Sequence, residues 1–289
     1  MTSHFASSAN SHRRARNDHT WAVAPEPPAP ETFARDEGRH VFGSAAAFYA
    51  AARPGYPDRV YDILRDRCQL GPSTRVLEIG AGTGQATKRL VALSAHVVAV
   101  EPNAALAEVL RAELKTAQGL EVIDAAFEDA DLPTSSFDLV VAATAFHWLD
   151  PDQAFPKIAL ALRPGGWLAL WWNVFGDPDQ PNPFHDATQP LLGDLSVGPG
   201  GGTYALEVAD RVSDLASHAF RDIEHEAIRW TLDLDATQAR QLYATYSNIA
   251  RLPDAQRVSI LDEIQRIAEQ EFGGRIERRM VTPIYTAHL

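Results

Sequence analysis

The chain has almost no cysteine. Cys68 is the single cysteine among 289 residues, so the sequence can form neither an internal disulfide nor a zinc site built from cysteines. Scarcity of cysteine is typical of proteins in a reducing compartment. We therefore expect a cytoplasmic protein in which Cys68 is a buried helix residue.

Long hydrophobic runs are also missing. No apolar stretch approaches the roughly 20 residues that a membrane-spanning helix needs. Arg13 and Arg14 are not followed by the apolar segment of an export signal. We expect no membrane partner.

Basic residues and metal-binding patterns are scarce as well. Lysine and arginine number 26 against 38 acidic residues, which gives a net charge of −12. Contacts to a phosphate backbone need clustered lysine and arginine, so the composition disfavours a nucleic-acid partner. His185, His218, His225 and His288 are scattered without the spacing of a metal set, and we expect no metal.

Residues 75–89 are the most informative segment that the chain does contain. The apolar run Val76–Ile79 predicts a strand buried on both faces. Gly80, Gly82 and Gly84 follow at every second position. Glycine accepts a positive φ and lets a ligand approach the backbone, and a helix beginning at Thr83 or Gln85 would offer free N–H groups to an anionic or carboxylate-bearing ligand.

Two acidic residues limit the kinds of ligand that this segment could bind. Glu101 ends a second apolar strand, His96–Val100, 17 residues beyond Gly84, where a carboxylate accepts hydrogen bonds from ribose hydroxyls. Glu78 stands just before the first glycine, where it would repel a diphosphate but suits a cationic amine. S-adenosylmethionine has an amine, a sulfonium and a ribose but no phosphate, so these residues favour it over NAD.

Four motifs in this order resemble a class I S-adenosylmethionine-dependent methyltransferase. They are Val76–Gly84, Glu101, Phe137–Val141 and Leu162–Gly166. The resemblance is close over about residues 45–175. Two further segments, Phe48–Pro57 and Phe146–Asp150, are similar to the small-molecule branch that includes trans-aconitate methyltransferases.

The alternation of strand and helix patterns predicts an α/β fold. With the resemblance, we expect a Rossmann-like seven-stranded, mostly parallel sheet with an antiparallel last strand, helices on both faces and a helical substrate-covering insertion. Strands are expected near 75–79, 96–100, 120–124, 138–143, 167–173, 223–232 and 281–288. Helices are expected near 45–52, 58–69, 84–93, 103–115, 152–162, 205–218, 236–250 and 254–272, with a short one near 184–192 in an otherwise irregular segment, 176–203.

The same patterns predict the domain organisation. Residues 1–40 form a disordered or loosely packed tail, because their composition cannot bury a core. Residues 41–289 form the methyltransferase domain. Within it we expect lid helices at 41–70, the core sheet at 71–175 and 205–289, and the cap insertion at about 234–272.

The resemblance implies a set of cofactor-binding residues. The glycine loop would hold the methionine part, with Glu78 on the amine and Glu101 on the ribose. The loop after the third strand would face the adenine, with Glu128 as first choice, Phe127 as its neighbour and Asp129 competing. An N-terminal aromatic residue would close over the cofactor. The expected cofactor-binding residues are Tyr49, Arg53, Glu78, Gly80, Ala81, Gly82, Gly84, Gln85, Glu101, Pro102, Phe127, Glu128, Thr144, Ala145 and Trp148.

Catalytic and acceptor-binding residues are less sharply indicated. His147 is either a general base or a packing residue, and Arg53 suits a carboxylate of cofactor or acceptor. Tyr243 and Tyr246, three residues apart, share a helix face and belong either to the acceptor pocket or to the core. The candidate acceptor-binding residues are Tyr56, Trp172, Asn173, Tyr204, Tyr243 and Tyr246.

The sequence thus predicts methyl transfer from S-adenosylmethionine to a small-molecule acceptor, with a preference for an oxygen acceptor. Two alternatives remain open: a protein that binds S-adenosylmethionine without transferring its methyl group, and an NAD-dependent oxidoreductase. The acceptor, the need for a base and the oligomeric state are left open.

Overall fold

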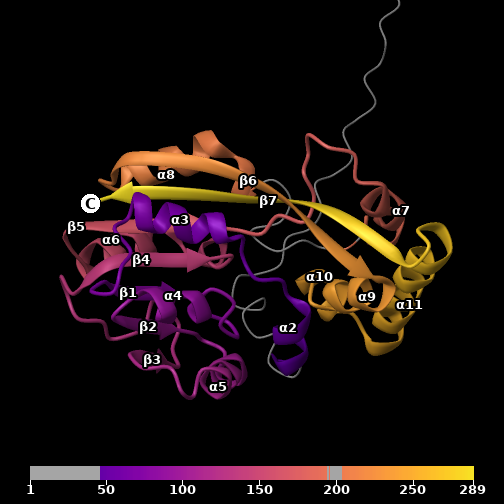
Figure 1. The fold of residues 1–289 in the computed structure, drawn as a ribbon, viewed down its shortest axis with the longest axis horizontal. Helices are drawn as coiled ribbons and strands as arrows, with labels where there is room; N and C mark the ends of the chain where they lie inside the picture. The colour runs from indigo at the N-terminus through magenta and orange to yellow at the C-terminus, as the bar shows by residue number, and fades with distance from the viewer. Residues whose placement is uncertain (1–45, 194, 196–203) are drawn as a thin grey trace, which may run out of the picture.

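The computed structural model describes residues 46–193, 195 and 204–289. The predicted tail at residues 1–40 lies outside this part of the chain, as do the first residues of the predicted lid segment. The described residues form a seven-stranded sheet with helices on both of its faces and a separate group of helices at one end (Figure 1).

The sheet has the strand order β3-β2-β1-β4-β5-β7-β6. The first five strands in this order are parallel, and β7 runs antiparallel to both β5 and β6. The predicted fold class is confirmed. The strands are β1 (Arg75–Ile79), β2 (His96–Val100), β3 (Leu120–Ile123), β4 (Phe137–Ala143), β5 (Leu162–Trp171), β6 (Arg221–Asp235) and β7 (Arg275–His288).

The helices cover the sheet and build the region beyond it. They are α2 (Ala46–Ala52), α3 (Asp58–Asp66), α4 (Thr87–Leu93), α5 (Ala104–Glu113), α6 (Pro151–Ala161), α7 (Pro183–Leu192), α8 (Val208–Ser217), α9 (Ala236–Ala244), α10 (Ser247–Ala250) and α11 (Asp254–Glu271). Two short 3-10 helices are η2 (Phe146–Trp148) and η3 (Tyr204–Leu206).

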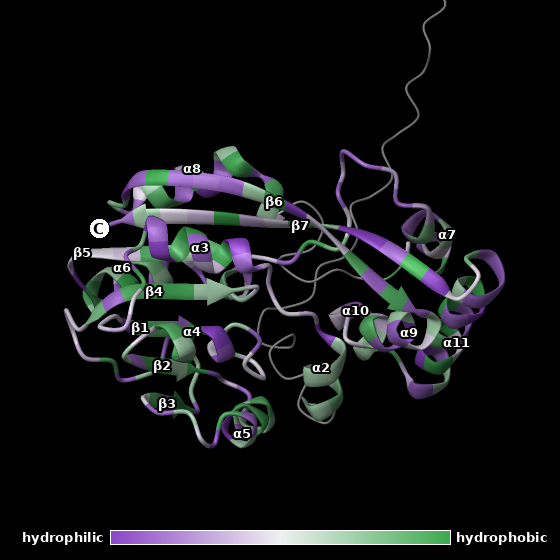
Figure 2. Cartoon of the chain, in the orientation of Figure 1, coloured by the Kyte–Doolittle hydropathy of each residue, from purple (hydrophilic) through white to green (hydrophobic). Residues whose placement is uncertain are grey.

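Strand β4 shows why this sequence forms a two-sided layer. All seven of its residues are buried, and its side chains alternate between the faces of the sheet. Leu139 and Val141 pack in the cluster that includes α3, whereas Val140 and Ala142 pack in the cluster that includes α6. A strand covered on both faces is expected to be largely apolar, and β4 is mostly hydrophobic in Figure 2. The exception is Asp138 near its start, which accepts from the backbone N–H of Arg75.

The last two strands extend well beyond the sheet. Strand β7 pairs with β5 through residues Ile284–His288, while β6 and β7 continue to pair with each other as far as Asp235 and Arg275. This two-stranded ribbon leads to α9, α10 and α11 (Figure 1). It explains why both strands are longer than the sequence pattern indicated, since their outer halves are not buried in the sheet.

A second core lies at the far end of this ribbon. Phe184 of α7 packs there with Ala239, Tyr243 and Ile264. We call α7 and α9–α11 together the cap. The helix predicted near 184–192 is therefore present, and it belongs to the cap rather than to an isolated loop.

Two local expectations were wrong. Helix α4 begins at Thr87, with Ala86 at its N-cap and no side-chain capping bond, so the turn after β1 is longer than a start at Thr83 or Gln85 would give. Cys68 is buried, but it lies just beyond the end of α3 rather than within it. Burial raises the pKa of its thiol to about 12.

The described ranges show neither a membrane-spanning helix nor a metal-binding cluster. No helix in these ranges is long and apolar enough to cross a membrane. These ranges also contain no group of three or more His, Cys, Asp or Glu residues placed to hold a metal ion.

Candidate active site

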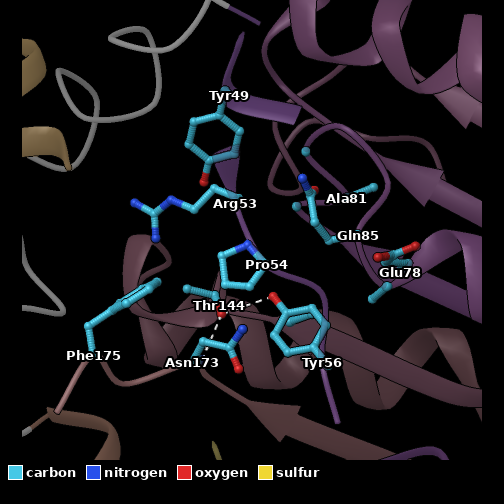
Figure 3. A pocket seen from close by; sticks show the side chains of 14 residues that line it. Tyr49, Arg53, Pro54, Tyr56, Glu78, Ala81, Gln85, Thr144, Asn173 and Phe175 are labelled. Atoms are coloured by element: carbon cyan, nitrogen blue, oxygen red, sulfur yellow. Dashed lines mark hydrogen bonds between the residues drawn. The ribbon is translucent and has the colours of Figure 1, made fainter. Parts of the chain in front are cut away.

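Two cavities adjoin at the carboxyl ends of β1, β2 and β4, the edge at which ligands bind in open parallel sheets. They share the lining residues Tyr49, Gly80, Gly82 and Thr144. The polar cavity, drawn in Figure 3, is further lined by Arg53, Pro54, Tyr56, Glu78, Ala81, Gln85, Ala86, Ala143, Asn173 and Phe175. The apolar cavity is further lined by Ile79, Val100, Glu101, Pro102, Leu106, Phe127, Ala145, Trp148 and Leu149.

The glycine loop forms the wall between the two cavities. The backbone N–H groups of Gly80 and Ala81 both donate to the carbonyl oxygen of Val100 (2.8 and 3.2 Å), which ties the loop to the end of β2. A Cβ on Gly80 would lie 2.5 Å from the Cβ of Ala145, and the φ of Gly80 is +68°. Only glycine fits this position without moving the neighbouring loop.

Gly84 has a different role from the one expected. A Cβ there would lie 2.6 Å from a methyl carbon of Leu110 in α5, and Gly84 lines neither cavity. This glycine allows the loop to pack closely on α5. Its predicted contact with a cofactor has no support from its position.

Glu101 is fixed by two backbone hydrogen bonds. Its Oε2 accepts from the N–H of Gly82 (2.8 Å) and its Oε1 accepts from the N–H of Asn103 (2.9 Å). The side chain of Asn103 in turn caps α5. Glu101 also lines the apolar cavity, so this carboxylate holds the glycine loop and forms part of the cavity wall.

Glu78 is a buried carboxyl group at the wall of the polar cavity. Its side chain is 1% exposed, and its Oε2 has no hydrogen-bond partner among the described residues. The pKa of Glu78 is raised to about 8: burial is the main cause, the hydroxyl of Thr87 opposes it, and the nearby Glu101 adds a smaller upward contribution. A buried carboxyl oxygen without a partner is costly, and a cationic amine in the cavity would satisfy it.

Lys157 holds the loop that follows β3. Its Nζ, on α6, donates to the carbonyl oxygens of Glu128 (2.8 Å) and Ala130 (2.6 Å) and lies 5.3 Å from the ring centroid of Phe127. Phe127 lines the apolar cavity as expected, whereas the side chain of Glu128 lines neither cavity. Sequence reasoning missed Lys157, because one half-buried lysine in an amphipathic helix gives no signal.

Arg53 directly follows α2, which lies in the predicted lid segment, and connects that helix to the cap. Its Nη2 donates to the carbonyl oxygen of Thr245 (2.8 Å). The guanidinium carbon lies 5.2, 5.3 and 5.5 Å from the ring centroids of Tyr49, Phe175 and Tyr246, as Figure 3 shows for the first two. Phe175, which sequence reasoning also missed, forms the cap side of the polar cavity.

The side of the polar cavity opposite the lid is a hydrogen-bonded set (Figure 3). Thr144 Oγ1 lies 3.0 Å from the hydroxyl of Tyr56 and accepts from the backbone N–H of Asn173 (3.2 Å). The Nδ2 of Asn173 donates to the carbonyl of Gly55, and its Oδ1 accepts from Thr282. Burial raises the pKa of Tyr56. These polar atoms already have partners, so they shape the cavity more than they offer bonds to a ligand.

The remaining predicted residues lie outside the two cavities. His147 and Trp172 contact each other, and Tyr204 packs beside both. Tyr243 and Tyr246 do pack together, with ring centroids 4.9 Å apart, but they lie in the cap core. Of the alternatives considered for these two tyrosines, the core position is the one observed.

The fold is an open α/β sheet with two adjoining cavities at the carboxyl ends of its strands. Comparisons with known proteins identify the class of protein. The methyltransferase domain family matches residues 77–170. An uncharacterized methyltransferase of Mycobacterium tuberculosis, Rv3342, is 34% identical over 226 residues, which cover 78% of this chain and 84% of that protein.

Several solved structures have the same fold, among them a methyltransferase and a cyclase. A putative type II methyltransferase from Anaeromyxobacter dehalogenans has a TM-score of 0.56 at 23% identity, covering 82% of this chain and 97% of that one. The [4+2]-cyclase SpnF has a TM-score of 0.55 at 16% identity, covering 90% and 98%. At these identities the likeness concerns the fold alone.

The chain belongs to the methyltransferase family, and its fold places it in the class I, S-adenosylmethionine-dependent branch. S-adenosylmethionine is accordingly its cofactor. The unpartnered Glu78 oxygen and the Glu101 carboxylate fit the amine and the ribose of that molecule.

Proposed function

We propose that this protein transfers the methyl group of S-adenosylmethionine to a small-molecule acceptor, with a preference for an oxygen atom. One observation carries the proposal. Two cavities of different chemistry share the wall formed by Gly80 and Gly82, and each contains one of the two carboxylates that such a cofactor needs.

The two cavities divide the cofactor between them. The apolar cavity suits the adenosine part, because Phe127 and Leu106 offer apolar contacts to a base and Glu101 accepts from the ribose. The polar cavity suits the methionine part, with Glu78 on the amine and Arg53 or Gln85 near the carboxylate. The cofactor supplies an already activated methyl group when it is bound.

The task of the protein is then to align the acceptor and exclude water. Tyr49 and Thr144 line both cavities, so we place the reacting centre beside them. Tyr49 comes from the lid helix, and Arg53 connects that helix to the cap. The acceptor would occupy the part of the polar cavity near Phe175, with the cap as its cover.

The preference for oxygen rests on two features. The segment from Phe48 to Pro57 is similar to trans-aconitate methyltransferases, and Arg53 brings a positive charge to the lining of the polar cavity. A guanidinium group binds a carboxylate well. The carboxylate that it binds belongs either to the cofactor or to the acceptor.

The two alternative functions differ in how well the site supports them. An NAD-dependent oxidoreductase is opposed by family membership and by Glu78, which would face the diphosphate from the end of β1, just before the glycine loop. A protein that binds the cofactor without transferring its methyl group remains the second candidate, because a [4+2]-cyclase has the same fold.

The proposal is tested with S-adenosylmethionine carrying a trideuterated methyl group. The purified protein is incubated with trans-aconitate and a panel of other small carboxylic acids, and products are measured by mass spectrometry. We expect one acid to gain the labelled methyl group, and Glu101→Ala to lower the gain when the cofactor is limiting. Cofactor binding without a labelled product from any acid would favour the non-transferring alternative.

A further inference from the structure

The hydrogen bond between Trp172 and His147 determines which nitrogen of the imidazole carries the proton. The indole Nε1–H of Trp172 donates to Nδ1 of His147 across 3.0 Å. An indole nitrogen is a donor only. Nδ1 must therefore be the unprotonated nitrogen of the ring, and in a neutral imidazole the proton then resides on Nε2.

The surroundings hold the indole in this position. Trp172 is 3% exposed and lies just after the end of β5. The rings of Tyr204 and Tyr285 stand edge-on to it, with centroids 5.9 and 6.2 Å away. The guanidinium of Arg211 lies 3.8 Å from the ring centroid of Tyr204 and fixes that ring in turn. The donor therefore cannot turn away from His147 without disturbing several packed side chains.

His147 is close enough to the site for its protonation state to matter. It lies on η2 between Ala145 and Trp148, both of which line the apolar cavity. Its ring centroid lies 4.9 Å from that of Trp148.

We infer that Trp172 is a positioning residue that holds His147 as a hydrogen-bond donor through Nε2, so that His147 is not the general base of the reaction. A base needs a lone pair directed at the acceptor, and the only ring lone pair of His147 is directed at Trp172. A second proton on Nδ1 would place two donors 3.0 Å apart and leave the buried indole without an acceptor.

The statement that His147 is not the general base rests on the proposed function. The assignment of its tautomer does not, because it follows from the hydrogen bond to Trp172 alone. The inference agrees with an acceptor that arrives ionised. With a carboxylate, the O–CH3 bond forms as the S–CH3 bond breaks, the electron pair stays on sulfur, and no proton is released. An acceptor that must lose a proton would need a base from another residue.

Nitrogen NMR on the free, full-length protein tests the inference without any acceptor. The protein is labelled with 15N on histidine and tryptophan, and His147→Gln assigns the signal among the ten histidines. At pH 7.5 we expect the pattern of an Nε2–H tautomer and a 15N–15N coupling across the hydrogen bond to Trp172. An Nδ1–H tautomer, or a doubly protonated ring, would overturn the inference.

A pair of matched variants tests the part played by Trp172. Trp172→Phe keeps an aromatic ring and removes the donor, so the Nδ1–H tautomer of His147 should become populated. Trp167→Phe removes an indole whose Nε1 has no hydrogen-bond partner among the described residues, and it should leave the His147 signals unchanged. Identical His147 spectra in wild type and Trp172→Phe would refute the positioning role.

If Trp172→Phe does not fold, the coupling in the wild type still decides the question. Failure to find methyl transfer would contradict the proposed function and leave the tautomer result unaffected.

Discussion

The buried carboxyl group of Glu78 leads to our most detailed prediction, which concerns the pH dependence of cofactor binding. The pKa of Glu78 is raised to about 8, chiefly by burial. In the free protein the group is therefore about 10% ionised at pH 7 and about 1% ionised at pH 6. If the ionised form binds the amine of the cofactor, affinity should rise about tenfold per pH unit from pH 6 to pH 7, or about 1.4 kcal/mol.

The same group should make the free protein less stable as the pH rises. The pKa of Glu78 is raised on folding, from an ordinary value of 4.5 to about 8, so between these values the folded protein keeps a proton that the unfolded chain has released. Stability then falls by about 1.4 kcal/mol per pH unit, about 5 kcal/mol in all. Glu78→Gln removes this loss but buries an amide that needs partners, at about 1–3 kcal/mol. We expect the variant to be roughly 2–4 kcal/mol more stable than wild type at pH 8.

Two assays check this prediction. Calorimetric titration between pH 6 and pH 8, in buffers of different ionisation enthalpy, should show about 0.9 proton released on binding at pH 7. Chemical denaturation gives the stability of wild type and Glu78→Gln. Glu121→Gln, at an exposed carboxyl group on β3, is the control and should behave like wild type. Binding that does not depend on pH, or a Glu78→Gln protein that binds as well as wild type at pH 8, would refute the reasoning.

Three further variants test other parts of the site. Glu101→Ala should weaken cofactor binding by about 1–3 kcal/mol, because a buried charged acceptor is lost, and an unchanged Kd would remove the ribose assignment. Lys157→Met should weaken binding of adenosine as well as of the whole cofactor, because the loop beside the apolar cavity loses two hydrogen bonds; equal calorimetric affinities would contradict this. Gly80→Ala should lower the Tm and cofactor affinity together, because its Cβ would meet Ala145 at 2.5 Å. Gly55→Ala, where a Cβ meets nothing within 4 Å, is the matched control, and an equal effect of the two would contradict the steric argument.

The parts of the fold that repeat a simple pattern were predictable. The buried run Val76–Ile79 and the alternation of strands and helices predict the parallel core, and the structure confirms it. The ribbon formed by the outer halves of β6 and β7 was not predicted, because its alternation of exposed and buried residues does not follow hydrophobicity. Arg278 occupies a buried position between Ile276 and Met280. The start of α4 was misplaced because Ala86, its N-cap, provides no side-chain cap.

The candidate site also contains residues that the sequence indicated and residues that it did not. Glu78 and Glu101 were found because their distances from the glycines are fixed by the strand-turn-helix unit. Lys157 and Phe175 were missed, because the contacts that matter come from segments distant in sequence. The aromatic residues were ambiguous for a physical reason: the same spacing suits a pocket and a core, and Tyr243 belongs to the core of the cap.

The most direct test of the account is a calorimetric titration of the purified protein with S-adenosylmethionine, then S-adenosylhomocysteine, then NAD, at pH 8. We predict one-site binding of the first two, weakened by Glu101→Ala, and no binding of NAD. Binding of NAD alone, or equal binding of S-adenosylmethionine by wild type and Glu101→Ala, would contradict a cofactor site built on the two carboxylates.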